Sequence, residues 1–204
     1  MELKRIGIFG GTFNPPHIGH LILAETAADN LNLDRVYFVP AANPPHKMGM
    51  PRAPVEDRVT RVELAIDGNA RFRLSRKDID RPGPHYAVDM VSLFAEEYPQ
   101  AELFFLMGSD SLRDLISWSR PQELLTMTSL VVMQRPSIYP DLATLTRELP
   151  QLLECLYFLN APEIEVSSTQ IVRLLQQNHS VRYQILPQVL DYLFEHRLYA
   201  DENY

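Results

Sequence analysis

Two glycines and two histidines stand close together early in the chain, with the spacing of a phosphate-binding loop. Gly10 and Gly11 follow a short apolar stretch, and glycine lets the backbone approach a ligand closely. His17 and His20 are three residues apart, so both side chains project from the same side of a first helical turn. The N-terminus of such a helix offers unpaired N–H groups and partial positive charge, which suit an anion. This loop therefore predicts a site that binds phosphate and donates hydrogen bonds to a phosphoryl group.

Each of these features also has a structural interpretation. A glycine pair can form a tight turn, Pro15 and Pro16 can begin a helix, and the histidines can be surface or capping residues. The loop matches neither the GxxxxGK[ST] phosphate loop, because no lysine stands in place, nor the GxGxxG dinucleotide fingerprint. The combination of all these residues in one short loop favours phosphate chemistry.

A second phosphate site is predicted where the penultimate helix should begin. Ser168 and Thr169 bring hydroxyl groups to this helix start, and Arg173 follows Thr169 by four residues, one helical turn later. Hydroxyls, exposed N–H groups and a guanidinium together form a clamp for phosphate. The alternative is a capping box, in which Ser167 and Gln170 satisfy the backbone at the helix start.

Two further loops carry polar side chains beyond predicted strands. The proline-rich loop from Pro40 to Lys47 ends in His46-Lys47, which adds a candidate phosphate contact to a rigid connection. Gly108 and Asp110 follow another apolar stretch, where Asp110 could accept hydrogen bonds from ribose hydroxyls or cap a helix.

The order of apolar and helical stretches predicts the scaffold that positions these loops: an α/β fold with a doubly wound parallel sheet. Strands that are apolar throughout suit a parallel sheet covered on both faces, and strand–helix alternation suits double winding. In such a sheet, ligands bind beyond the carboxyl ends of the strands, so the predicted loops should meet there. Strands are expected at 6–9, 36–39, 72–74, 103–107 and 130–133, and helices at 18–30, 55–66 and 86–97, with short helices between the last two strands.

The pattern changes to mainly helical after about Pro136. We expect one domain over residues 1–204, made of an α/β core at 1–136 and a small helical C-terminal subdomain at 137–204 that packs on the sheet. The subdomain should contain helices at 142–149, 168–177 and 187–196 and a weak strand at 156–159.

Composition excludes several classes of protein. A net charge of -7 argues against binding to nucleic acid or to an anionic membrane, and no apolar run approaches the ~20 residues of a membrane span. Cys155 is the only cysteine and no signal peptide is recognisable, so a reducing cytoplasmic location is expected. The six histidines lack HExxH-type spacing, and one cysteine cannot build a zinc site alone, so no dedicated metal site is expected. The oligomeric state stays open, a homo-oligomer included.

Two motifs together carry a resemblance to a known superfamily. Gly10-Gly11-Thr12-Phe13 followed by His17-Ile18-Gly19-His20 resembles the GTFDPxHxGH signature of the (T/H)xGH nucleotidyltransferases, although Asn14 stands where that signature has aspartate. The segment from Val166 to Arg173 resembles their ISSTxxR motif, which holds the β- and γ-phosphates of ATP. The resemblance implies a Rossmann-like nucleotidyltransferase fold, and ATP binding by Gly10, Gly11, Thr12, Phe13, His17, His20, Gly108, Asp110, Ser168, Thr169 and Arg173.

Further segments narrow the resemblance to the bacterial nicotinate-mononucleotide adenylyltransferases. The loop 40–47 is similar to their PxxxPPHK loop, and residues 108–112 to their GxDxL element. Trp118, which alone is more typical of packing, matches the tryptophan that lies against the pyridine ring in that family. The resemblance implies acceptor binding by Asn43, His46, Lys47, Tyr86, Ala87 and Trp118, and catalysis by His17, His20, Lys47 and Arg173.

The chain departs from the family pattern near the expected acceptor. Residues 81–90 resemble an RxGxSYTxDT stretch, but His85 replaces the usual serine, Ala87 the usual threonine and Met90 a second threonine. In the family the first threonine helps to define the nicotinate pocket. These changes leave the selectivity between nicotinate and nicotinamide open.

The resemblance implies the reaction ATP + nicotinate mononucleotide → nicotinate adenine dinucleotide + pyrophosphate. The phosphate of the acceptor would attack the α-phosphorus of ATP in line, and Mg²⁺ would arrive with ATP, bridging phosphates with few protein ligands. Alternatives are adenylyl transfer to nicotinamide mononucleotide or to another phosphate acceptor, and a catalytically silent nucleotide-binding regulator.

Overall fold

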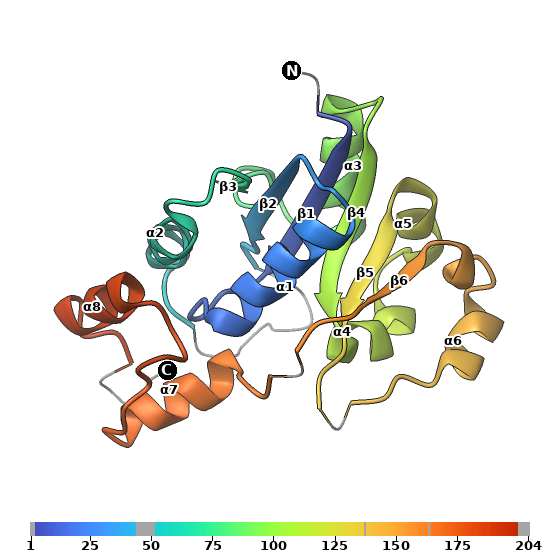
Figure 1. Ribbon diagram of the computed structural model, residues 1–204. Helices are drawn as coiled ribbons and strands as arrows, with labels where there is room; N and C mark the ends of the chain where they lie inside the picture. Colours follow the sequence, from blue (N-terminus) through green and yellow to red (C-terminus); the bar gives the residue numbers. More distant parts are fainter. Residues whose placement is uncertain (1–2, 44–51, 137, 163, 200–204) are drawn as a thin grey trace.

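The computed structural model of the protein describes residues 3–43, 52–136, 138–162 and 164–199 (Figure 1). At its centre is a six-stranded sheet with the strand order β3-β2-β1-β4-β5-β6. Every neighbouring pair of strands is parallel. The strands are β1 (Arg5–Gly11), β2 (Arg35–Pro40), β3 (Phe72–Leu74), β4 (Glu102–Gly108), β5 (Ser129–Met133) and β6 (Leu156–Leu159).

Helices cover both faces of the sheet, as strands without polar alternation require. The helices are α1 (Ile18–Asn30), α2 (Val55–Ile66), α3 (Ala87–Glu97), α4 (Ser109–Arg113), α5 (Pro121–Met127), α6 (Leu142–Glu148), α7 (Ser168–Gln176) and α8 (Pro187–Glu195), with short 3₁₀ turns η2 (Leu115–Ser117) and η3 (Leu152–Glu154). Alternate residues of β1 point to opposite sides: Ile6 and Ile8 pack in the core with α3 and α5, and Phe9 packs with α1 and α2. In Figure 1, α1 lies in front of the strands.

The strand order places the binding edge of the sheet. From β1 the chain winds outward through β2 and β3, then returns to the other side of β1 and continues through β4, β5 and β6. The point where the winding reverses lies between β1 and β4, and a crevice opens there at the carboxyl ends of the strands. The predicted doubly wound parallel sheet is confirmed, and the expected helices and strands agree with the observed ones to within about one or two residues.

One strand has a different position from the one expected. Residues 156–159 were expected in the C-terminal subdomain, but they form β6 and pair in parallel with β5, so the sheet extends beyond residue 136. This is an edge strand, and its central residues Tyr157 and Phe158 are exposed. Adjacent strand residues point to opposite faces, so neither face of β6 is fully covered at its centre.

The last two helices, α7 and α8, form an apolar cluster that contains no strand residue, whereas Leu145 of α6 belongs to the core cluster of the sheet. Ile171 of α7 and Val189 and Leu193 of α8 form a separate apolar cluster with Ala65 of α2 and with Tyr199. Figure 1 shows α7 and α8 on the α2 side of the molecule. That the whole chain is a single domain stays a prediction. In the described part of the chain, no helix has the length and apolar character needed to cross a membrane.

Candidate active site

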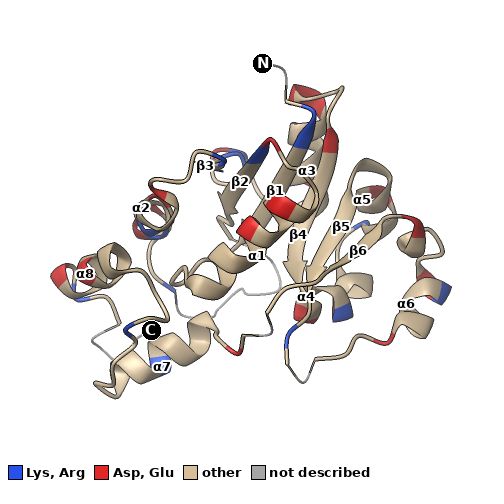
Figure 2. Cartoon of the chain, in the orientation of Figure 1, with Lys and Arg blue, Asp and Glu red and all other residues tan. Residues whose placement is uncertain are grey.

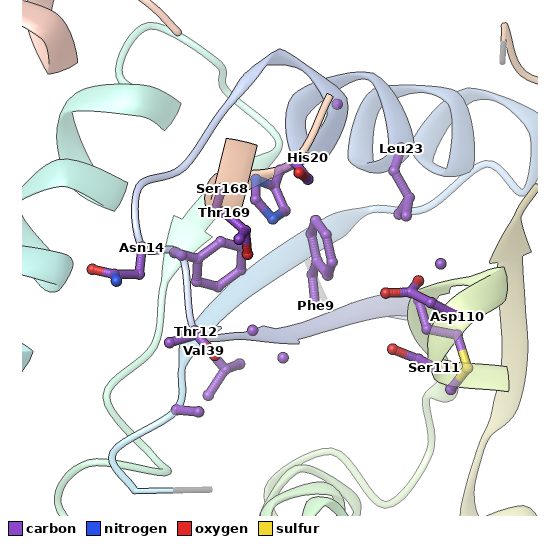
Figure 3. A pocket seen from close by; sticks show the side chains of 18 of the residues that line it. Phe9, Thr12, Asn14, His20, Leu23, Val39, Asp110, Ser111, Ser168 and Thr169 are labelled. Atoms are coloured by element: carbon purple, nitrogen blue, oxygen red, sulfur yellow. The ribbon is translucent and has the colours of Figure 1, made fainter. Parts of the chain in front are cut away.

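A cleft of about 950 Å³ lies at the carboxyl ends of the strands, with walls from both ends of the chain (Figure 3). It brings most of the predicted site residues together. Those lining it are Gly10, Gly11, Thr12, Phe13, His17, His20, Tyr86, Ala87, Gly108, Asp110, Trp118, Ser168, Thr169 and Arg173. Asn43 is not among the lining residues; its side chain accepts a hydrogen bond of 2.5 Å from Arg52, which does line the cleft. His46 and Lys47 lie outside the described residues.

The first wall of the cleft is the loop between β1 and α1. The rings of His17 and His20 stack with their centroids 3.6 Å apart. This stacking depends on Gly19, because a Cβ atom there would lie 3.1 Å from the His17 ring. The backbone N–H of His17 donates to Nδ1 of His20 over 3.1 Å. Since Nδ1 of His20 accepts this bond, the ring carries its proton on Nε2, and Nε2–H is its donor.

His17 is a buried histidine, with only 3% of its surface exposed. Burial, together with the nearby charge of Arg135, lowers the pKa of His17 from 6.5 to about 3. Its Nδ1 atom has no hydrogen-bond partner among the described residues. At neutral pH His17 is therefore an uncharged imidazole, and it can offer an incoming phosphate a hydrogen bond.

The burial of His17 predicts an acid-dependent loss of stability. Between pH 6.5 and about 3 the unfolded chain binds a proton at His17 that the folded chain does not, so the free energy of unfolding falls as the pH falls. We expect His17→Gln to reduce this fall, as measured by urea unfolding at pH 7 and pH 4.5. The exposed His179 is the matched control, and equal pH dependence in His17→Gln and His179→Gln would contradict the prediction.

The second wall is the loop after β4. A Cβ atom at Gly108 would overlap Oδ1 of Asp110 and lie 3.0 Å from Nε of Arg135, so a side chain there would displace the Asp110 carboxylate. Asp110 forms an ion pair of 3.4 Å with Arg135, and the Arg135 backbone N–H donates to Oγ of Ser109 over 3.0 Å. Arg135 also lines the cleft, and sequence reasoning did not select it as a site residue. Arg135 could have been predicted as a site residue from its position just beyond β5, at the carboxyl edge of the sheet where ligands bind.

The third wall comes from the start of α7. Oγ of Ser167 accepts the Gln170 N–H over 3.2 Å, so the capping interpretation holds for this serine. Oγ of Ser168 donates to the carbonyl oxygen of Pro15 over 2.8 Å, which ties α7 to the first loop. Figure 3 shows Ser168 and Thr169 over the His20 side of the cleft, opposite Asp110. Ser167 therefore caps the helix, while Ser168 and Thr169 line the cleft.

The buried guanidinium of Arg58 holds together three backbone segments near the cleft. Arg58 of α2, 1% exposed, donates hydrogen bonds to four backbone carbonyl oxygens. Desolvation lowers the pKa of Arg58 to about 10, so it remains charged at neutral pH. Its acceptors are Thr12 at 2.9 Å, Ala41 at 2.8 Å, Ala42 at 3.3 Å and Ala53 at 3.2 Å. One side chain thus joins the loops that follow β1 and β2 and the segment before α2.

The residue at the aspartate position of the family signature has a structural role here. Oδ1 of Asn14 accepts the Tyr199 hydroxyl over 2.6 Å and the Ala53 N–H over 3.2 Å. Arg61 donates to the same hydroxyl. Asn14 thereby joins the first loop to α2 and to the segment after α8. Sequence reasoning assigned no role to Tyr199 or Arg61.

Part of the remaining wall of the cleft is aromatic and aliphatic. Trp118 packs edge-on against Phe105, with ring centroids 5.9 Å apart, and both residues line the cleft. Tyr86 and Ala87, at the start of α3, continue this wall together with Met90. Trp118 therefore packs against the core and also lines the cleft. This wall suits a flat, partly apolar ring.

No cluster of three His, Cys, Asp or Glu residues suited to a metal ion occurs in the described part of the chain. Asp110, which lines the cleft, forms an ion pair with Arg135.

Sequence comparisons agree with this arrangement. The cytidylyltransferase-like family model matches residues 8–174, a range that includes all three walls of the cleft. A Thermomicrobium roseum protein named a probable nicotinate-nucleotide adenylyltransferase is 42% identical, over 97% of this chain and 92% of the relative. A Thermus thermophilus protein with the same name is 43% identical, over 96% of this chain and 99% of the relative.

Solved structures share the fold. Plasmodium falciparum nicotinic acid mononucleotide adenylyltransferase complexed with NaAD matches with a TM-score of 0.79 at 20% identity, over 96% of this chain and 97% of that one. The same enzyme complexed with APC gives a TM-score of 0.77 at 18% identity.

Proposed function

This chain belongs to the cytidylyltransferase-like family and, within it, to the nicotinate-nucleotide adenylyltransferases; from this premise we propose that it transfers the adenylyl group of ATP to nicotinate mononucleotide. The products are nicotinate adenine dinucleotide and pyrophosphate. One observation carries the proposal: Ser168 donates to Pro15, so two phosphate-type loops 153 positions apart in sequence face one cleft.

We assign each part of ATP to a group of residues that lines the cleft. The donors at His17 and His20 face the reacting α-phosphate, and Ser168, Thr169 and Arg173 hold the β- and γ-phosphates that leave as pyrophosphate. Gly108 lets the ribose approach Asp110. Gly10, Gly11, Thr12 and Phe13 form the floor beneath the nucleotide.

The acceptor would occupy the opposite side, against Tyr86, Ala87 and Trp118. Asn43, His46 and Lys47 belong to the loop that would approach its phosphate, with Lys47 assisting charge stabilisation in the attack. The phosphate oxygen attacks the α-phosphorus, the bond to the bridging oxygen breaks, and pyrophosphate carries away the released charge. No covalent enzyme intermediate is needed.

The charges that line the cleft are more evenly balanced than those of the protein as a whole. The net charge is -7, and Figure 2 shows acidic and basic residues interspersed over the helices. The cleft, in contrast, is lined by three arginines, Arg52, Arg135 and Arg173, and by three aspartates, Asp78, Asp110 and Asp114. Arg173, the basic residue of α7, is the arginine that we assign to the leaving phosphates. Mg²⁺ enters as part of the Mg-ATP substrate and neutralises further phosphate charge.

We place the reaction in the cytoplasm, because a lone cysteine and free ATP fit a reducing compartment. ATP and nicotinate mononucleotide are the proposed partners, without nucleic acid or membrane. A homo-oligomer remains open.

Pyrophosphate release from Mg-ATP tests the reaction. We expect release with nicotinate mononucleotide and much slower release with the amide, measured by a coupled phosphate assay. A His20→Ala sample purified in parallel controls for contaminating activity. Equal rates with acid and amide would overturn the selectivity but keep the transfer reaction. ATP binding without release on either acceptor would support a silent nucleotide-binding regulator instead.

A further inference from the structure

The loop that carries His17 and His20 contains a residue with a strained backbone. Phe13 has a positive φ of 49°, a left-handed conformation that is uncommon for residues other than glycine. Phe13 is 1% exposed, and its ring packs edge-on against His20 with ring centroids 5.1 Å apart. Such a conformation persists only where the surrounding structure imposes it. The position of His20 therefore depends on what holds Phe13 in place.

Hydrogen bonds hold the residues on either side of Phe13. Before it, the carbonyl oxygen of Thr12 accepts a hydrogen bond from the buried Arg58 over 2.9 Å. After it, Oδ1 of Asn14 accepts the Tyr199 hydroxyl over 2.6 Å. The second bond comes from the far end of the described chain, beyond α8, and neither bond involves the sheet.

Arg61 fixes the direction of the hydrogen bonds at Tyr199. A guanidinium can only donate, so the hydroxyl oxygen of Tyr199 accepts from Arg61 and its proton goes to Asn14. Tyr199 and Arg61 are buried, at 1% and 0% exposed, and the Arg61 guanidinium lies 5.4 Å from the centroid of the Tyr199 ring. The hydroxyl therefore has one orientation, and it transmits the position of α2 to the loop.

Asn14 acts on His20 indirectly. In Figure 3 the Asn14 side chain points away from the His20 ring. The link runs through the backbone of the loop to Phe13, whose ring supports His20, and to the His17 N–H, which donates to Nδ1 of His20 over 3.1 Å. A shift of Asn14 would therefore move two supports of the His20 ring.

We propose that Tyr199, fixed by Arg61, is a positioning residue for the transfer reaction: by holding Asn14 it keeps Phe13, and with it His20, in the arrangement that serves catalysis. Tyr199 itself does not line the cleft. The inference rests on the proposed function, because it concerns the role of His20 in that reaction. It also explains why asparagine can stand at the aspartate position of the family signature, since its amide oxygen accepts this hydrogen bond as a carboxylate would.

Tyr199→Phe removes the hydroxyl and keeps the ring. We expect it to lower kcat about 10- to 100-fold, because a small displacement of a catalytic group is costly, and to leave the affinity for ATP close to that of the wild type. Contacts from Ser168 and Gln184 still hold the loop in this variant. The matched control is Tyr192→Phe, which removes a hydrogen bond of 2.7 Å from α8 to Asp57 of α2 and should keep its kcat.

A double-mutant cycle with His20→Ala separates positioning from a merely structural role. If Tyr199 acts through His20, Tyr199→Phe lowers kcat in the wild-type background but not in the His20→Ala background. An equal fall of kcat in both backgrounds, or an unchanged kcat in a folded Tyr199→Phe, would overturn the inference and leave the transfer reaction intact. If Tyr199→Phe does not fold, Asn14→Asp must retain more kcat than Asn14→Leu, because only aspartate keeps the acceptor oxygen.

The ring nitrogen chemical shifts of His20 give a readout that does not require catalysis. We expect Tyr199→Phe to change them and Tyr192→Phe to leave them as in the wild type. Unchanged shifts in Tyr199→Phe would count against the positioning of His20. A wild-type protein inactive with both acceptors would instead remove the proposed function, and the catalytic role inferred for Tyr199 with it.

Discussion

We expect His20→Ala to lower kcat by about 10²–10³, while the affinity for ATP stays close to that of the wild type. The reason is the fixed direction of its donor. The His17 N–H donates to Nδ1 of His20, so Nε2–H is the donor that the ring presents. A donor held in place before the reaction stabilises charge that develops in the transition state, and its loss appears in kcat.

Two amide variants test this assignment of atoms. The side-chain N–H₂ of glutamine can reach the place of Nε2, whereas that of asparagine reaches only the place of Nδ1. His20→Gln should therefore retain more activity than His20→Asn, as measured by steady-state kinetics and by ATP binding. A parallel loss of ATP affinity and rate in His20→Ala would mean that this histidine serves ground-state binding.

Arg58→Met should lower the free energy of unfolding by about 3 kcal/mol or more, because it leaves buried carbonyl oxygens without a donor at about 1–3 kcal/mol each. Four carbonyl oxygens depend on this one guanidinium. They belong to three segments that shape the cleft, so kcat/KM should fall as well under conditions in which the variant is fully folded.

Urea unfolding with a surface control checks this expectation. Arg147 is an exposed arginine whose partner is the adjacent Glu148, and exposed pairs contribute about 0–1 kcal/mol. Arg147→Met should therefore be nearly neutral. Arg58→Lys should fall between the two, since an ammonium has three donors and no fork geometry. A loss below about 1 kcal/mol in Arg58→Met would show that water replaces the guanidinium at these carbonyls.

Much of the site could be predicted because its chemistry is local in sequence. The glycine pair, the HxGH spacing and the serine-threonine-arginine segment each lie within one turn or loop. The rule that ligands bind at the carboxyl edge of the sheet then brings the first two walls together. By the same rule, Arg135, which lies just beyond β5, could have been predicted as a site residue.

The residues that sequence reasoning missed act through long-range contacts. Arg58 reaches Thr12 across 46 positions, and Tyr199 reaches Asn14 across 185. No periodicity in the chain indicates such partners. The burial of His17 was not predicted either, because it depends in part on distant segments: the N–H of the next residue, Ile18, donates to the carbonyl oxygen of Gln184. The strand β6 was expected outside the sheet because the segments on either side of it in sequence are helical, and its pairing with β5 is a contact between segments far apart in the chain.

The contact between Asn14 and Tyr199 has a consequence for the order in which the enzyme is made. The first phosphate loop leaves the ribosome early, but the hydroxyl that holds it is translated 185 residues later. At about 5–20 residues per second, the interval is roughly 10–40 s. During that time the sheet can form around β1 to β5 while the loop lacks its C-terminal support. A nascent chain should therefore acquire its fold before it acquires its activity, and catalysis should begin only when the last helices have docked.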